Sequence, residues 1–87
     1  MSLYGYGFAD RLAKLLEQHN VSCYKIAEFT HLDQSYLSRL RSGDKHPSPE
    51  TLVKISLALV KYGADIRLPD IESLFQACGR SLNIKDL

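Results

Sequence analysis

The chain has 87 residues, of which 45% are hydrophobic and 24% are charged, and its formal net charge at pH 7 is +1. This length and composition suit one small domain with a single hydrophobic core. Its apolar runs are too short to cross a bilayer and no secretory signal is seen at its start, so we expect a cytoplasmic protein without a membrane span. The two cysteines, Cys23 and Cys78, lie far apart without a CxxC pair, which favours reduced thiols.

The sequence predicts five helices, at residues 8–19, 23–29, 34–42, 49–62 and 70–78. In the longer ones, apolar residues recur three or four positions apart, which is the spacing of one helical face. No strand pattern, internal repeat or low-complexity linker is present. The expected fold class is therefore all-α.

The predicted organisation is a single domain over residues 1–87, with a core at about 8–79. Residues 1–7 are expected to form a flexible lead-in, because two glycines there favour a mobile chain end. Residues 80–87 are a tail too short to assign to an element.

Capping residues mark the expected helix ends. Ser22 and Asp33 are preferred N-caps for the second and third helices, because their side-chain oxygens can accept from first-turn amides. Gly43 suits a left-handed residue after the third helix, since it lacks a Cβ. Ser48 and Pro49 begin the fourth helix. The resulting order of helix, tight turn, helix and basic loop leaves the third helix free to enter the DNA major groove.

Ordered pieces across the centre of the chain carry a family pattern. They are Val21-Ser22, Ile26-Ala27-Glu28, Ser35-Tyr36-Leu37-Ser38-Arg39, Gly43, Pro47-Ser48 and Glu50-Thr51-Leu52-Val53-Lys54-Ile55. Together they resemble the Cro/phage-repressor (XRE-like) helix-turn-helix family, over roughly residues 8–60. The resemblance implies a compact five-helix, lambda-repressor-like domain that regulates transcription with its third helix in the major groove of double-stranded DNA. Nothing in the sequence points to a cofactor, a metal or a small-molecule ligand.

The outer face of the third helix is the expected base-reading surface. Leu37 and Leu40 face inward, which leaves polar residues on the opposite side. The candidates for base contacts are Gln34, Ser35, Ser38 and Arg39. Gln34 can pair with adenine through N6 and N7, Arg39 can pair with guanine through O6 and N7, and serine is permissive. These positions also match the family's base-contacting residues; the alternative is that they only solvate a surface.

Phosphate contacts are expected at a helix start and around the basic loop. The backbone N–H groups of Cys23 and Tyr24 lie at a helix N-terminus, which attracts anions. The family usually carries Gln at the position of Cys23. The remaining candidates surround a loop that resembles the family's second phosphate-binding segment, and they are Arg41, Ser42, Lys45 and His46.

Two further departures from the family pattern concern packing. The family's turn usually has Gly where this chain has His31, which predicts a positive φ at His31. The family's Arg in the first helix and Glu late in the third, which form a buried ion pair, are replaced by Leu16 and Arg41. These two changes are consistent with each other, because an apolar Leu16 leaves no cation to repel Arg41.

Surplus apolar surface in the C-terminal half predicts a homodimer. The fourth helix is apolar almost all round, and such a helix needs a second neighbour. The expected interface residues are Leu57, Val60, Leu68, Ile71, Leu74 and Phe75. The alternative is that the fifth helix covers the fourth within one subunit. A dimer would also compensate for a net charge of only +1, because two copies add their DNA contacts.

Neither catalysis nor a metal site is expected. His19, His31 and His46 are scattered, and no His/Cys pair has metal-ligand spacing. No glycine-rich phosphate loop follows a predicted strand. The competing hypothesis is a protein-interaction domain of the same fold, such as an antitoxin-like or adaptor domain with little DNA affinity. The near-neutral charge favours that hypothesis, whereas the polar face of the third helix favours DNA.

Overall fold

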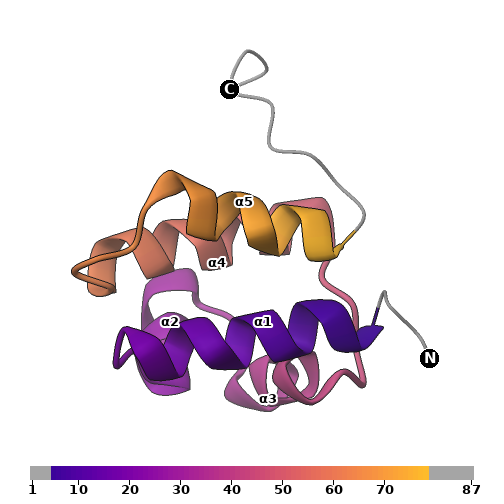
Figure 1. Ribbon diagram of the computed structural model, residues 1–87. Helices are drawn as coiled ribbons and strands as arrows, with labels where there is room; N and C mark the ends of the chain where they lie inside the picture. Colours follow the sequence, from indigo (N-terminus) through magenta and orange to yellow (C-terminus); the bar gives the residue numbers. More distant parts are fainter. Residues whose placement is uncertain (1–4, 79–87) are drawn as a thin grey trace.

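Helices make up most of the protein. The computed structural model describes residues 5–78, and within them it has five helices and no strand (Figure 1). The helices are α1 (Gly5–Gln18), α2 (Cys23–Thr30), α3 (Gln34–Ser42), α4 (Pro49–Tyr62) and α5 (Leu68–Ala77). The predicted all-α fold with five helices is confirmed. None of the helices within this range has both the length and the apolar character that a membrane span requires. Residues 1–4 of the expected lead-in and the tail at 80–87 lie outside the described residues.

Side-chain caps begin three of the helices as predicted. Ser22, Asp33 and Ser48 each have an extended backbone and accept a hydrogen bond from an amide in the following turn. Gly43 ends α3 with a φ of 92°, in the left-handed region that favours glycine. Because these interactions involve only near neighbours in the chain, the limits of α3 and α4 agree with the predicted ones.

The first helix begins earlier than predicted. It starts at Gly5, so residues 5–7 of the expected flexible lead-in are helical. A Cβ added to Gly7 would lie 3.7 Å from the carbonyl oxygen of Ala77. The first turn of α1 therefore lies beside the end of α5, a contact between distant parts of the chain that no local pattern reveals.

The fifth helix begins earlier than predicted as well, in this case by two residues. It starts at Leu68, and Pro69 lies inside the first turn instead of preceding the helix. A proline is tolerated there because its missing N–H has no helical partner in the first turn. The Asp70 carboxylate accepts from the backbone N–H of Arg67 at 3.0 Å and so satisfies one of the amides at this helix start.

The turn between α2 and α3 contains a histidine in a left-handed conformation. His31 has φ 62° and ψ 22°, which confirms the prediction for this position. Its backbone N–H donates to the carbonyl oxygen of Ala27 at 2.8 Å. The hydroxyl of Thr30 donates to Ile26 O at 2.7 Å and accepts from Leu32 N at 3.2 Å. The turn is thus fixed by backbone and threonine bonds, while the His31 side chain is exposed.

We expect His31→Gly to be neutral or slightly stabilising, by less than about 1 kcal/mol, because glycine adopts a positive φ without steric cost. His31→Val should be less stable than the wild type, since a β-branched side chain crowds the backbone in this region. Thermal unfolding of the two variants beside the wild type measures both effects. A strongly destabilised His31→Gly would show instead that the imidazole makes an essential contact.

The hydrophobic core draws on all five helices. α1 packs against α3 and α5, while α2 packs against α3 and α4. The largest fully buried side chains are Phe8, Leu15, Ile26, Leu40, Leu52, Ile55, Leu59 and Leu74. Because α3 contacts both α1 and α2 through its inner side, its position is set by the core and its other side is free.

Two residues of the expected dimer interface belong to this core. Leu74 is 0% exposed and Ile71 is 6% exposed, because α5 folds back on α1 and directs them inward. The structure therefore places Leu74 wholly in the core, whereas Ile71, although buried, also lines the hollow between α4 and α5. Leu57, Val60 and Leu68 are more than half exposed. The apolar surplus is therefore smaller than predicted and lies along one side of α4 and α5.

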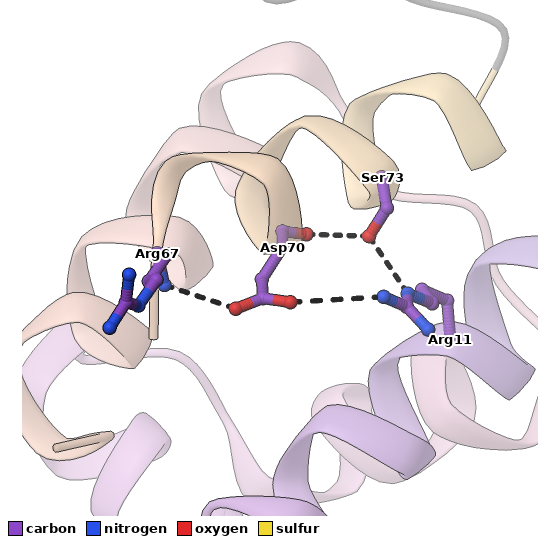
Figure 2. Close-up of polar contacts among 4 residues, drawn as sticks. All are labelled: Arg11, Arg67, Asp70 and Ser73. Carbon is purple, nitrogen blue, oxygen red and sulfur yellow. Dashed lines mark hydrogen bonds and ion pairs between the residues drawn. The ribbon is translucent and has the colours of Figure 1, made fainter. Parts of the chain in front are cut away.

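A polar cluster ties α5 to α1 (Figure 2). Arg11 of α1 donates through Nε to Ser73 Oγ at 2.8 Å, and its Nη2 lies 3.9 Å from Asp70 Oδ1. The Ser73 hydroxyl donates in turn to the carbonyl oxygen of Asp70 at 2.6 Å. These bonds hold the first two turns of α5 on α1 rather than on α4.

Candidate DNA-binding surface

The outer face of α3 is polar and open to solvent. On the inner side, Leu37 and Leu40 are 2% and 0% exposed, which anchors the helix in the core. The four residues expected to contact bases are all exposed, namely Gln34, Ser35, Ser38 and Arg39. The structure therefore brings these four side chains together on one helical face, in agreement with the spacing of the inner leucines.

The start of α3 is held by an acid and a serine. The Asp33 carboxylate accepts from Ser35 N at 3.0 Å and from Ser35 Oγ at 2.9 Å. These two hydrogen bonds to the charged form, with a smaller attraction from Arg39, hold the pKa of Asp33 below its usual value. The cap is therefore intact at neutral pH, and its contribution to stability is lost only as the pH falls through that lowered pKa. Since the Ser35 hydroxyl proton is already donated, its oxygen is suited to accept a bond from a base amino group.

The basic loop is folded tightly onto the end of α3. The carbonyl oxygen of Arg39 accepts from the backbone N–H groups of Asp44 and Lys45 at 2.9 and 3.2 Å. The N–H of Gly43 and the hydroxyl of Ser42 donate to the same oxygen, each at 3.1 Å. The backbone of the loop is thus fixed relative to the polar outer face of α3. The four phosphate candidates here are exposed, namely Arg41, Ser42, Lys45 and His46.

The start of α2 meets the end of α3. Arg41 Nη1 donates to Cys23 Sγ at 3.8 Å, although 18 positions separate the two residues in the chain. Tyr24, the next residue of α2, is 58% exposed. The first amides of α2 and the Arg41 guanidinium therefore present positive charge on the same side of the molecule. Leu16 and Arg41 line one hollow, so the two residues that replace the family's ion pair are neighbours.

Two charged residues of α2 were not among the predicted contact residues. Glu28 lines a hollow together with Tyr24 and Gln34, so an acid adjoins the start of α3. The Nζ of Lys25 lies over the Tyr62 ring, 5.4 Å from its centroid, in a cation–π contact between α2 and α4. Both placements depend on how α2 crosses its neighbours, and periodicity within α2 carries no signal of that crossing.

The two short crossed helices and the exposed polar face define a helix-turn-helix domain. The family model for helix-turn-helix proteins, HTH_3, matches residues 12–59, which is more than half of the chain and includes all of α2 and α3. The chain belongs to this family, the Cro/C1-type or XRE-like helix-turn-helix proteins, as the resemblance implied. Membership indicates a DNA-binding transcription regulator. No match was found among curated proteins or among solved structures.

Proposed function

We propose that the protein is a transcription regulator that binds double-stranded DNA sequence-specifically, with α3 in the major groove. The observation that carries the proposal is the exposed polar face of α3, whose inner leucines and two caps fix its position. Gln34 has the donor and acceptor that pair with adenine, and Arg39 has the fork that pairs with guanine. The hydroxyls of Ser35 and Ser38 can each bond to more than one kind of base. A rigid helix carrying these groups has the geometry that direct base readout requires.

Phosphate contacts on both sides of α3 would set its register on the duplex. One site is the start of α2, where Cys23 and Tyr24 contribute the first amides of the helix and Cys23 contacts Arg41. The other is the loop after α3, with Lys45 and His46. Such contacts carry no sequence information themselves, but they orient the base-reading side chains.

The protein is further proposed to act as a homodimer and to reside where the DNA is, in the cytoplasm or nucleoid. A net charge of +1 supplies little attraction to a polyanion. Two copies combine their contacts at high effective concentration, with two α3 helices about 34 Å apart on one face of the duplex. We assign it no catalytic role, in keeping with a family of regulators.

The test is an electrophoretic mobility shift with duplex DNA at several salt concentrations. Binding should weaken as salt rises, because each phosphate contact releases counterions. Lys45→Ala should weaken binding to all sequences alike. It should also make the negative slope of log affinity against log salt concentration shallower by about one. Lys14→Ala is the matched control, since Lys14 is an exposed cation on α1 paired with Asp10, and it should leave the slope unchanged. A chain that binds no duplex even at low salt would instead be a protein-interaction domain.

A further inference from the structure

One acid lies between the two parts of the proposed DNA-binding surface. Glu28 of α2 lines a hollow together with Tyr24 and Gln34. Tyr24 belongs to the first turn of α2, the proposed phosphate site, and Gln34 is the first residue of α3 and a proposed base contact. A duplex held by both parts therefore passes the Glu28 side chain, which is exposed.

The Glu28 carboxylate has no ion-pair or hydrogen-bond partner among residues 5–78. Lys25 lies three positions earlier on the same helix, a spacing at which opposite charges can pair. Its ammonium group lies instead over the Tyr62 ring of α4, 5.4 Å from the centroid. The second helix thus directs its cation toward α4 and leaves its acid uncompensated beside α3.

The second carboxylate of this hollow already has a structural role. Asp33 also lines the hollow, but it caps α3 and accepts from the backbone N–H of Ser35 at 3.0 Å and from the Ser35 hydroxyl at 2.9 Å. These two bonds fix the Asp33 side chain against the first turn of α3. Of the two acids, Glu28 is therefore the one whose side chain is free to turn toward a bound duplex.

A carboxylate at the surface of DNA is subject to two opposite effects. Phosphates repel it, so it weakens binding wherever it meets no hydrogen-bond donor. In the major groove, the base donors are the amino groups at cytosine N4 and adenine N6. Adenine sets the acceptor N7 beside its amino group, whereas cytosine presents its amino group alone. A carboxylate that reaches the groove therefore favours cytosine over the other three bases.

We propose that Glu28 is a specificity-determining residue, which accepts a hydrogen bond from the N4 amino group of a cytosine next to the base that Gln34 contacts. The inference rests on the proposed function and adds a residue of α2 to the base contacts of α3. On sequences without that cytosine, the carboxylate meets only acceptors and phosphates, so binding there is weaker. Glu28 thus lowers affinity for random DNA and widens the difference between the specific site and its competitors.

The test is selection of bound sequences from a random duplex library with the wild type, Glu28→Gln and Glu28→Ala. The wild type should select a cytosine at one position. Glu28→Gln should select adenine there instead, because a glutamine amide can donate to N7 and accept from the N6 amino group. Glu28→Ala should select no base at that position, and its ratio of affinities for the selected site and random duplex should fall roughly tenfold. Preferences at the other positions should stay as in the wild type.

Glu72→Gln and Glu72→Ala are the matched controls, because Glu72 is an exposed acid on α5 that bonds to Gln76 and lies outside this hollow. Both should select the wild-type sequence, and circular dichroism should show unchanged helix content in all four variants. The inference is overturned if both Glu28 variants select the wild-type sequence.

It is also overturned if Glu28→Ala changes affinity for the selected site and for random duplex by the same factor, since the carboxylate would then act only by repelling phosphates. In both of these cases a sequence selected by the wild type would still support the proposed function. A wild type that selects no sequence contradicts the proposed function and the inference together.

Discussion

Leu40→Ala is expected to lower the free energy of unfolding by about 2–5 kcal/mol, the largest effect we predict. Leu40 is 0% exposed on the inner side of α3, so its truncation removes buried surface and leaves a cavity beneath the face that we propose reads bases. Denaturant unfolding of the wild type and the variant measures the difference. DNA affinity should fall with the folded fraction, because Gln34 and Arg39 depend on the same helix for their position.

Leu57→Ala is the matched control for that measurement. It is the same substitution at a side chain that is 56% exposed on α4, and at concentrations where the chain is monomeric it should cost less than about 1 kcal/mol. Equal losses of unfolding free energy for Leu40→Ala and Leu57→Ala would contradict the assignment of Leu40 to the core. They would also contradict the anchoring of α3 on which the proposed function depends.

Arg39→Ala is expected to remove the preference for one base pair. The variant should lose about 1–3 kcal/mol of binding free energy on the specific site and little on random duplex. The Arg39 side chain is exposed on the outer face of α3. Its carbonyl oxygen, which anchors the loop after α3, remains in the alanine variant. The fold and the loop should therefore be preserved while the guanidinium fork is lost.

The measurement begins with selection of bound sequences from a random duplex library and then compares the selected site with single-base variants. Arg41→Ala is the control on the same helix, because Arg41 lies beside Cys23 at the proposed phosphate site. Arg41→Ala should weaken binding to all DNA sequences alike. If Arg39→Ala also weakened specific and random DNA equally, Arg39 would be a phosphate contact and not a base contact.

Short-range chemistry made the central part of this fold predictable. The caps at Ser22, Asp33 and Ser48 and the left-handed residue Gly43 all form as expected. Each depends on hydrogen bonds or steric limits within about four residues, so the residues responsible can be recognised in the local sequence. The positive φ of His31 followed from the family's glycine at that place in the turn.

Packing between distant segments was much less predictable, and α5 shows why. Its apolar spacing was recognised, but the direction of its apolar side was not, so Leu74 was assigned to an interface although it is 0% exposed. The spacing is the same whether a helix covers its own chain or another copy. In the structure α5 packs on α1, where Arg11 bonds to Ser73 and lies beside Asp70, and this packing turns Leu74 inward.

The sequence by itself therefore determined the number and type of the helices, the N-caps of α2, α3 and α4 and the polar outer face of α3, because all of these follow from neighbours a few residues apart. Only the tertiary structure decided that Arg41 reaches Cys23 and that a groove remains between α4 and α5. Those features depend on the angles at which helices cross. The angles are set by the fit of many buried side chains at once, and no single stretch of the chain encodes them.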